Sequence, residues 1–228
     1  MADQAGIERV SPLWLGIGTS VSLVALLMIS ETLLGRWDLL LVDEHFDPLA
    51  RVSTGVLRDV RIAFVHCLLV GYLPAALLHV LRSGKRTVAR LQGALDCTRE
   101  ECEKLARSIR LSKRGLVTAA LVGFVLALMP PLFVEPVPEA PWDPASWNPE
   151  VAWHRVLGPI MGVGLAWLTY AIVAVSLRMS RIAQRLSRID LLDLSPLAPF
   201  AQQGLTNALL LFGTLSISAL MMLETGFT

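Results

Sequence analysis

Glu31 is the one Asp, Glu, Lys or Arg residue that falls inside the long apolar segments of this 228-residue sequence. An ionisable group at that depth is a candidate for function, because lipid solvates a charge poorly. Glu31 also lies near the end of its segment, 13–34, where a carboxylate can extend to interfacial water. Two interpretations stay open, an intramembrane ionisable site and an interfacial side chain.

The last apolar segment, 204–223, carries polar residues on one helical face at offsets of seven and four, namely Asn207, Thr214 and Ser218. A stripe of this kind can line a water-filled pathway. Small hydroxyls also bond to the preceding turn of their own helix or to a neighbouring helix. The pattern therefore predicts either a pore lining or a polar packing face.

Two histidines, His66 and His79, share one predicted helix at a spacing that could present two axial haem ligands. Each haem would need an opposing ligand, but the other histidines, His45 and His154, are predicted to lie on the outer side. We therefore expect no haem and no other cofactor.

A metal site is also conceivable in the predicted outer loop, where three carboxylates and an imidazole cluster, namely Asp43, Glu44, His45 and Asp47. Ligands so close in sequence seldom converge on one ion. Asp47 followed by Pro48 instead predicts a helix start, with Asp as the N-cap and Pro at the first helical position. We expect no metal site.

The three cysteines, Cys67, Cys97 and Cys102, lack the spacing of zinc ligands. They are predicted to lie in a membrane span or in the cytoplasm, where thiols stay reduced, so no disulfide is expected. The sequence contains no phosphate-binding loop, dinucleotide fingerprint, zincin helix or nucleophile elbow. We therefore predict no catalytic residue and no enzyme activity.

The elements that position these side chains are five apolar windows, each long enough to cross a hydrocarbon core of about 30 Å. With 54% hydrophobic residues, the composition is typical of a membrane protein. The predicted fold class is all-α, a polytopic helical membrane protein with five transmembrane helices and cytoplasmic helical extensions, and residues 1–228 form one membrane domain. The spans are 13–34, 62–81, 115–134, 156–177 and 204–223.

Positive charge orients the chain, because Lys and Arg close to a span resist translocation. The segment 82–114 holds ten of them and the segment 178–188 holds four. This predicts a cytoplasmic N-terminus and an outer C-terminus, with 15 basic residues inside against five outside. The excess of Arg over Lys suggests a bacterial source, and hence the bacterial inner membrane and a periplasmic C-terminus.

A cytoplasmic helical hairpin is predicted at 83–114, and a helical extension with a connector at 178–203. Thr98 and Glu101 match a capping box, so a helix should begin near residue 99 and run without a break into the third span. The apolar stripes at the 3 and 4 spacing of packed helices are Val88, Leu91 and Leu95, then Cys102, Leu105 and Ile109, and finally Met179, Ile182, Leu186 and Ile189. These extensions either bundle below the membrane or lie flat on anionic headgroups.

Small residues recur every four positions in the fourth span, at Gly158, Gly162 and Ala166, which predicts a helix-packing face. No internal repeat is visible in the sequence.

The leading functional hypothesis is a non-enzymatic integral membrane subunit of an oligomeric channel, transport or scaffold assembly. The alternative is a membrane-embedded signal-input module that relays through the hairpin. The expected partners are the lipid bilayer, further copies or a larger membrane complex, and a cytoplasmic protein at 83–114. Nucleic acid is not expected to bind.

Overall fold

The computed structural model describes residues 11–33, 46–47, 52–53, 56–91, 94–95, 97–133, 149–186 and 197–220. The described residues are helical apart from turns, short irregular segments and two antiparallel strands of two residues each, which confirms the predicted all-α class. The elements are α2 (Pro12–Leu33), β1 (Phe46–Asp47), β2 (Val52–Ser53), α4 (Val56–Arg90), α5 (Arg99–Ser108), α6 (Lys113–Phe133), α7 (Pro149–Ala183) and α8 (Ala198–Ala219).

Among the described residues, four helices, α2, α4, α6 and α7, are long and apolar enough to cross a membrane. The predicted fifth span overlaps α8 from residue 204 to Ala219, and α8 is not among these four candidates. The chain is thus a helical bundle with four candidate membrane helices.

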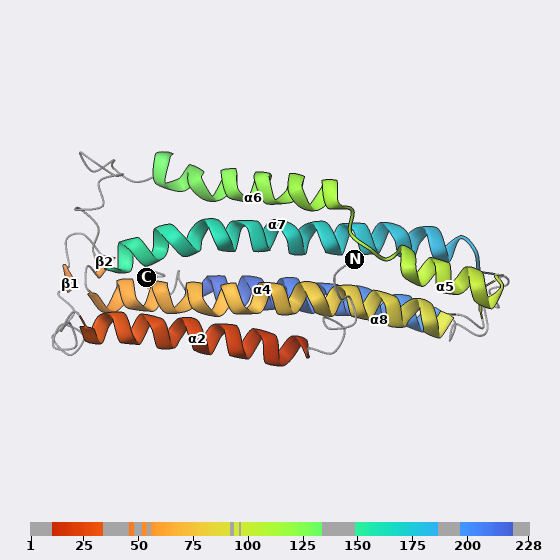
Figure 1. Ribbon diagram of the computed structural model, residues 1–228, viewed down its shortest axis with the longest axis horizontal. Helices are drawn as coiled ribbons and strands as arrows, with labels where there is room; N and C mark the ends of the chain where they lie inside the picture. Colours follow the sequence, from red (N-terminus) through yellow and green to blue (C-terminus); the bar gives the residue numbers. More distant parts are fainter. Residues whose placement is uncertain are drawn as a thin grey trace.

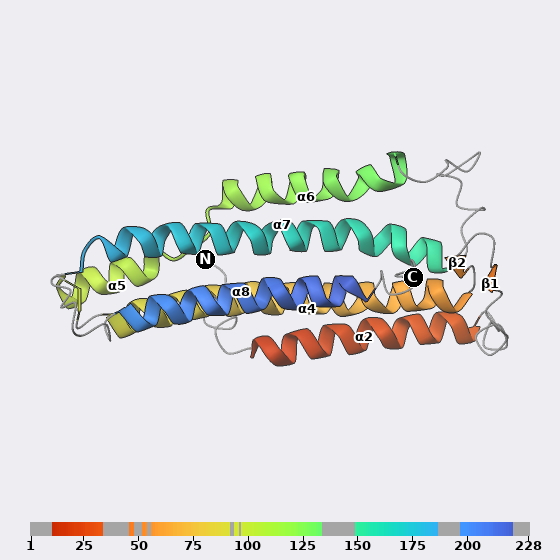
Figure 2. The same ribbon diagram turned by 180° about the vertical axis from the view of Figure 1, so that it is seen from behind.

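The long helices form one row, in the order α6, α7, α4, α2 (Figure 1). In that view α5 lies in front of the C-terminal ends of α4 and α7, whereas α8 lies behind α4; Figure 2 shows the reverse. The core cluster joins α4 and α7, with α5 and α8 packed against it. The central pair α4 and α7 therefore carries most of the packing.

Helices α4 and α7 run in the same direction and pack in register (Figure 1). The facing pairs are Leu73 with Gly164 and Gly84 with Val175. In both pairs the second residue lies 91 positions after the first, and the two pairs are eleven residues apart. Eleven residues make about three turns of α-helix at about 3.67 residues per turn, so the two contacts lie on one face of each helix. Beyond the ends of both helices, Leu95 and Leu186 form an isolated antiparallel β-bridge.

Each outer helix crosses its long neighbour at small residues. A Cβ atom at Gly162 of α7 would lie 2.5 Å from the Gly123 carbonyl oxygen of α6, and one at Gly123 would lie 2.7 Å from Ala166 Cβ. The predicted packing residues Gly162 and Ala166 therefore lie at the α6–α7 crossing, whereas Gly158 has open space around it.

The α2–α4 crossing has the same character, because a Cβ at Gly71 would lie 2.7 Å from the Gly16 carbonyl oxygen. Gly71 of α4 and Gly162 of α7 are again 91 positions apart. The hairpins α2–α4 and α6–α7 thus repeat one packing arrangement, although no repeat is visible in the sequence.

Two predicted helix boundaries are wrong. The helix expected to start at Pro48 begins at Val56, because Phe46–Asp47 and Val52–Ser53 pair as strands. The helix expected to run from residue 99 into the third span breaks between Ser108 and Lys113. Ile109 leaves helical geometry and is buried in the core, and the Ser112 hydroxyl then accepts the Gly115 N–H at 2.9 Å, which caps the start of α6.

The expectation of no disulfide is also wrong, because Cys97 is disulfide-bonded. Cys97 lies in the short connection between α4 and α5, beside the core cluster. Cys67 is a free, buried thiol.

The capping box at the start of α5 is confirmed. The Thr98 backbone N–H donates to Glu101 Oε2 at 2.8 Å, and the Glu101 N–H donates to Thr98 Oγ1 at 3.3 Å. The hydrogen bond from the Thr98 backbone, followed by the one from its hydroxyl, lowers the pKa of Glu101. Since the folded pKa is depressed, this contribution to α5 stability is present above the unfolded pKa and is lost as pH falls through the folded value.

We expect Thr98→Ala to raise the pKa of Glu101 toward its ordinary value, because one of the two Thr98 donors to the carboxylate is removed. Carbon-13 NMR titration of glutamate-labelled protein measures the shift. Ser108→Ala is the control, since the Ser108 hydroxyl donates to the Leu105 carbonyl at the other end of α5. An unchanged Glu101 titration in Thr98→Ala would contradict the capping geometry.

Candidate functional site

A chain of polar side chains joins α4, α8 and α7 within the bundle. Thr87 Oγ1 donates to Gln203 Oε1 at 3.3 Å, and Gln203 Nε2 donates to Asn207 Oδ1 at 2.9 Å. Asn207 Nδ2 in turn donates to Ser176 Oγ at 3.3 Å. Thr87, Gln203 and Asn207 are buried. We call these four residues the polar clamp.

Further bonds fasten α8 to α4 on both sides of the clamp. Arg90 donates to Gln202 Oε1 at 2.8 Å, and the Tyr72 hydroxyl donates to the Leu210 carbonyl at 2.8 Å. A Cβ at Gly213 would lie 2.5 Å from that hydroxyl, so glycine leaves room for Tyr72. Intramolecular hydrogen bonds each contribute about 0.5–1.5 kcal/mol net to stability. Their sum holds α8 in place although α8 is only partly apolar.

The polar stripe of the last predicted span faces this interface. Asn207 and Thr214 are each 6% exposed, and Ser218 is half-buried. Thr214 donates to the Leu210 carbonyl at 3.0 Å and Ser218 to the Thr214 carbonyl at 2.9 Å, both within α8. This geometry favours polar packing over the lining of a water-filled pathway.

Glu31 lies in the last turn of α2 and is fully buried. One turn earlier, Leu27 packs with Ala63 and Cys67 of α4 and Leu157 of α7. The Glu31 carboxylate is therefore enclosed by protein and does not extend into water, whereas its depth in a membrane stays a prediction.

The two histidines of α4 do not form a paired site. His66 is buried, and its Nδ1 lies 2.7 Å from the Ile62 carbonyl oxygen. Because a carbonyl oxygen can only accept, Nδ1 carries a proton in this contact. His79 is exposed. Within the described ranges, no group of three or more His, Cys, Asp or Glu side chains could hold a metal ion. In the cluster of Asp43, Glu44, His45 and Asp47, the first three residues fall outside those ranges.

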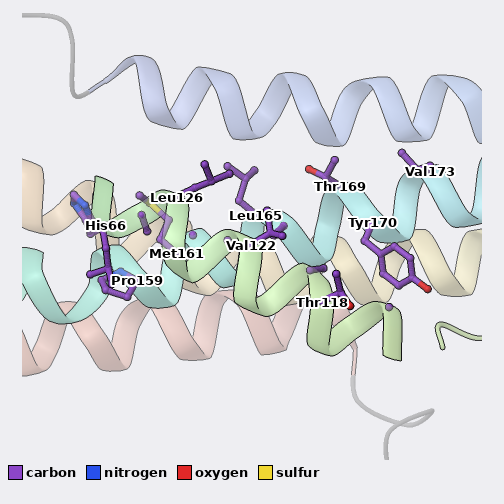
Figure 3. Close-up of a pocket in the computed structure, with 18 of the residues that line it drawn as sticks. His66, Thr118, Val122, Leu126, Pro159, Met161, Leu165, Thr169, Tyr170 and Val173 are labelled. Carbon is purple, nitrogen blue, oxygen red and sulfur yellow. The ribbon is translucent and has the colours of Figure 1, made fainter. Parts of the chain in front are cut away.

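A groove of about 900 Å³ runs between α6 and α7 (Figure 3). Its base contains the small residues of the helix crossing, among them Gly123 and Gly162. Its walls are apolar, and wall residues such as Val122 and Leu165 are 50% and 42% exposed, so the groove is open along one side.

The two ends of this groove are polar. His66 of α4 and Arg155 of α7 line one end, and Thr118 and Tyr170 line the other. Figure 3 shows His66 beside Pro159 and, far along the groove, Tyr170 beside Thr118. The Tyr170 hydroxyl lies 3.1 Å from Ser112 Oγ. A smaller cavity of about 430 Å³ is lined by α2, α4, α6 and α7, and includes Pro74 and Trp167.

Sequence reasoning missed Thr87, Ser176 and Gln203 of the clamp and Arg155 of the groove. Gln203 and Asn207 are four residues apart on one helical face, and this spacing was the available signal. Thr87 and Ser176 carry no such signal, because their partners lie on another helix. Comparison with protein-family models, curated proteins and solved structures finds no significant match.

Proposed function

We propose that this chain is a non-enzymatic integral membrane subunit that acts as a helical scaffold in an oligomeric membrane assembly. The observation that carries the proposal is the in-register pair of α4 and α7, each 35 residues long. Apolar contacts join the two helices over more than twenty residues, and the polar clamp adds α8. A core held by these apolar contacts and hydrogen bonds suits a protein that holds neighbouring subunits in position.

The membrane placement that we propose has five spans, with α8 as the fifth, in a bacterial inner membrane. Four apolar helices and the 15 to five distribution of basic residues support it. The N-terminus is then cytoplasmic and the C-terminus periplasmic.

The outer helices support an assembly. Each of α2 and α6 packs mainly on one long neighbour and leaves large apolar side chains exposed, such as Trp14 and Val21 on α2 and Leu121 and Phe124 on α6. In a bilayer these faces meet lipid or further subunits. A channel along the stripe of α8 has less support, because Asn207 and Thr214 are engaged within the subunit.

A signal relay is the second candidate, and one contact favours it. Ile109, directly after α5, is buried against the α4–α7 pair, where a Cβ at Gly84 would lie 3.1 Å from Val175 and 3.4 Å from Ile109. Sliding of α4 against α7 would therefore displace α5. The charged face of α5, on which Glu100, Lys104 and Arg107 are exposed, would move with it. A cytoplasmic partner bound to this face would then sense the displacement of α5.

The test of the scaffold is its copy number in native lipid. We expect particles extracted with a lipid-retaining polymer to contain two or more copies, or one copy with a fixed partner, by mass photometry. Single copies alone across the accessible concentrations would contradict the proposal.

Cysteine labelling in the same membranes separates a scaffold from a channel. With the native cysteines replaced by serine, Thr214→Cys should resist a water-soluble maleimide, and the exposed Ser108→Cys should react only after the membrane is opened. Fast labelling of Thr214→Cys would favour a water-filled pathway instead.

A further inference from the structure

We infer that the groove between α6 and α7 is a binding site for one anionic phospholipid, with an acyl chain along the groove and the phosphate at Arg155. The inference goes beyond a scaffold role, and it rests on the proposed placement of α6 and α7 in a bilayer.

The shape of the groove suits an alkyl chain. Its lining extends on α6 from Gly115 to Leu128, about 20 Å at the rise of an α-helix. Its volume of about 900 Å³ falls in the range of about 300–1,000 Å³ that is typical of small-molecule sites. Glycine and alanine at the base reduce side-chain bulk there, so a thin alkyl chain can lie close to the two helices.

The open side of the groove gives lipid a route to it. Val122, Leu126, Leu165 and Val173 line the groove and are between 42% and 58% exposed. In a bilayer the medium at this side is hydrocarbon, which fills an apolar groove without loss of hydrogen bonds. Water in the same space would find few polar partners between the two ends.

The charge at one end selects the head group. Among the described residues that line the groove, Arg155 is the one with a permanently charged side chain, and it lies at the start of the apolar part of α7. A guanidinium has five N–H donors, so Arg155 can keep its contact within the protein and still bind a phosphate. His66 lines the same end. An anionic head group therefore fits this end better than a zwitterionic one.

Native mass spectrometry of the full chain with phosphatidylglycerol and with phosphatidylcholine tests the site. We expect wild-type protein to retain phosphatidylglycerol in preference, and Arg155→Gln to lose this preference by about tenfold, since a hydrogen bond to a charged group is removed. Val122→Trp should fill the groove and reduce the binding of both lipids. Arg181→Gln, an exposed arginine outside the groove, is the charge control.

The matched control for the groove is Val117→Trp, because Val117 is also an exposed valine of α6 but does not line the groove. Equal lipid retention by Val122→Trp and Val117→Trp would overturn the site, as would an unchanged preference in Arg155→Gln. If Val122→Trp lowers the copy number and leaves lipid retention unchanged, the groove binds a second copy and the inference is wrong. If wild-type protein retains no lipid at all, the membrane placement fails together with the site.

Discussion

Gly162→Leu is expected to lower the folded yield of the protein severely. A Cβ at this position would lie 2.5 Å from the Gly123 carbonyl oxygen and 2.6 Å from Ala127 Cβ on α6. Neither atom can move aside at a low cost in free energy, because one belongs to the backbone and the other is the first atom of a side chain. The helices would have to separate along the crossing, at a cost of about 3 kcal/mol.

Thermal denaturation followed by fluorescence-detected size-exclusion chromatography measures this loss. For a chain of this size, about 3 kcal/mol corresponds to a drop in Tm of roughly 6–12 °C. Gly158→Leu is the control: Gly158 belongs to the same predicted small-residue face, but a Cβ added there would meet nothing within 4 Å. A similar Tm loss in both variants would mean that leucine disturbs α7 itself and not the crossing.

The apolar windows predicted from sequence lie close to the helices of the structure. The windows 13–34 and 115–134 overlap α2 and α6 almost completely, because a run of about 20 apolar residues can satisfy its backbone in lipid only as a helix. The start of α5 at Arg99 was equally predictable, since the capping box is encoded by two residues three positions apart.

The break between α5 and α6 was harder to predict. Nothing in residues 109–112 is Pro or Gly, and the helix ends there because Ile109 gains burial against α4 and α7, which a local pattern does not encode. Ser112 before Lys113 was a possible N-cap, and it was the one local signal for a new helix.

The pairing of α4 with α7 could not be predicted from hydrophobicity. Both helices are apolar on most faces within the predicted spans, so the apolar pattern does not show which face meets the partner. The small residues at Gly16, Ser20, Gly71 and Ala75 carried a usable signal, because their spacing of four matches that of Gly162 and Ala166. The polar clamp could not be predicted for a similar reason. A hydrogen bond between residues far apart in the sequence produces no recognisable spacing of residue types.

Met179→Glu is the second variant with a large expected effect, and it tests the register of the central pair. Met179 is 5% exposed in the core cluster, where a carboxylate loses both the packing of the thioether and its own hydration. Together these losses cost about 4 kcal/mol or more, a large part of the stability of an ordinary domain. Ser180→Glu, one residue along on an exposed position, should cost little.

A compensating charge then shows which residue of α4 faces position 179. The spacing of 91 places Val88 opposite Met179, and Val88 is fully buried in the same cluster. We expect Val88→Lys to restore part of the folded yield of Met179→Glu, with a coupling energy of about 1–3 kcal/mol in a double-mutant cycle. Val80→Lys, equally buried but two turns away, should restore nothing. Rescue by Val80→Lys and not by Val88→Lys would show that α4 and α7 pair in a different register, and the spacing of 91 between facing residues would then be wrong.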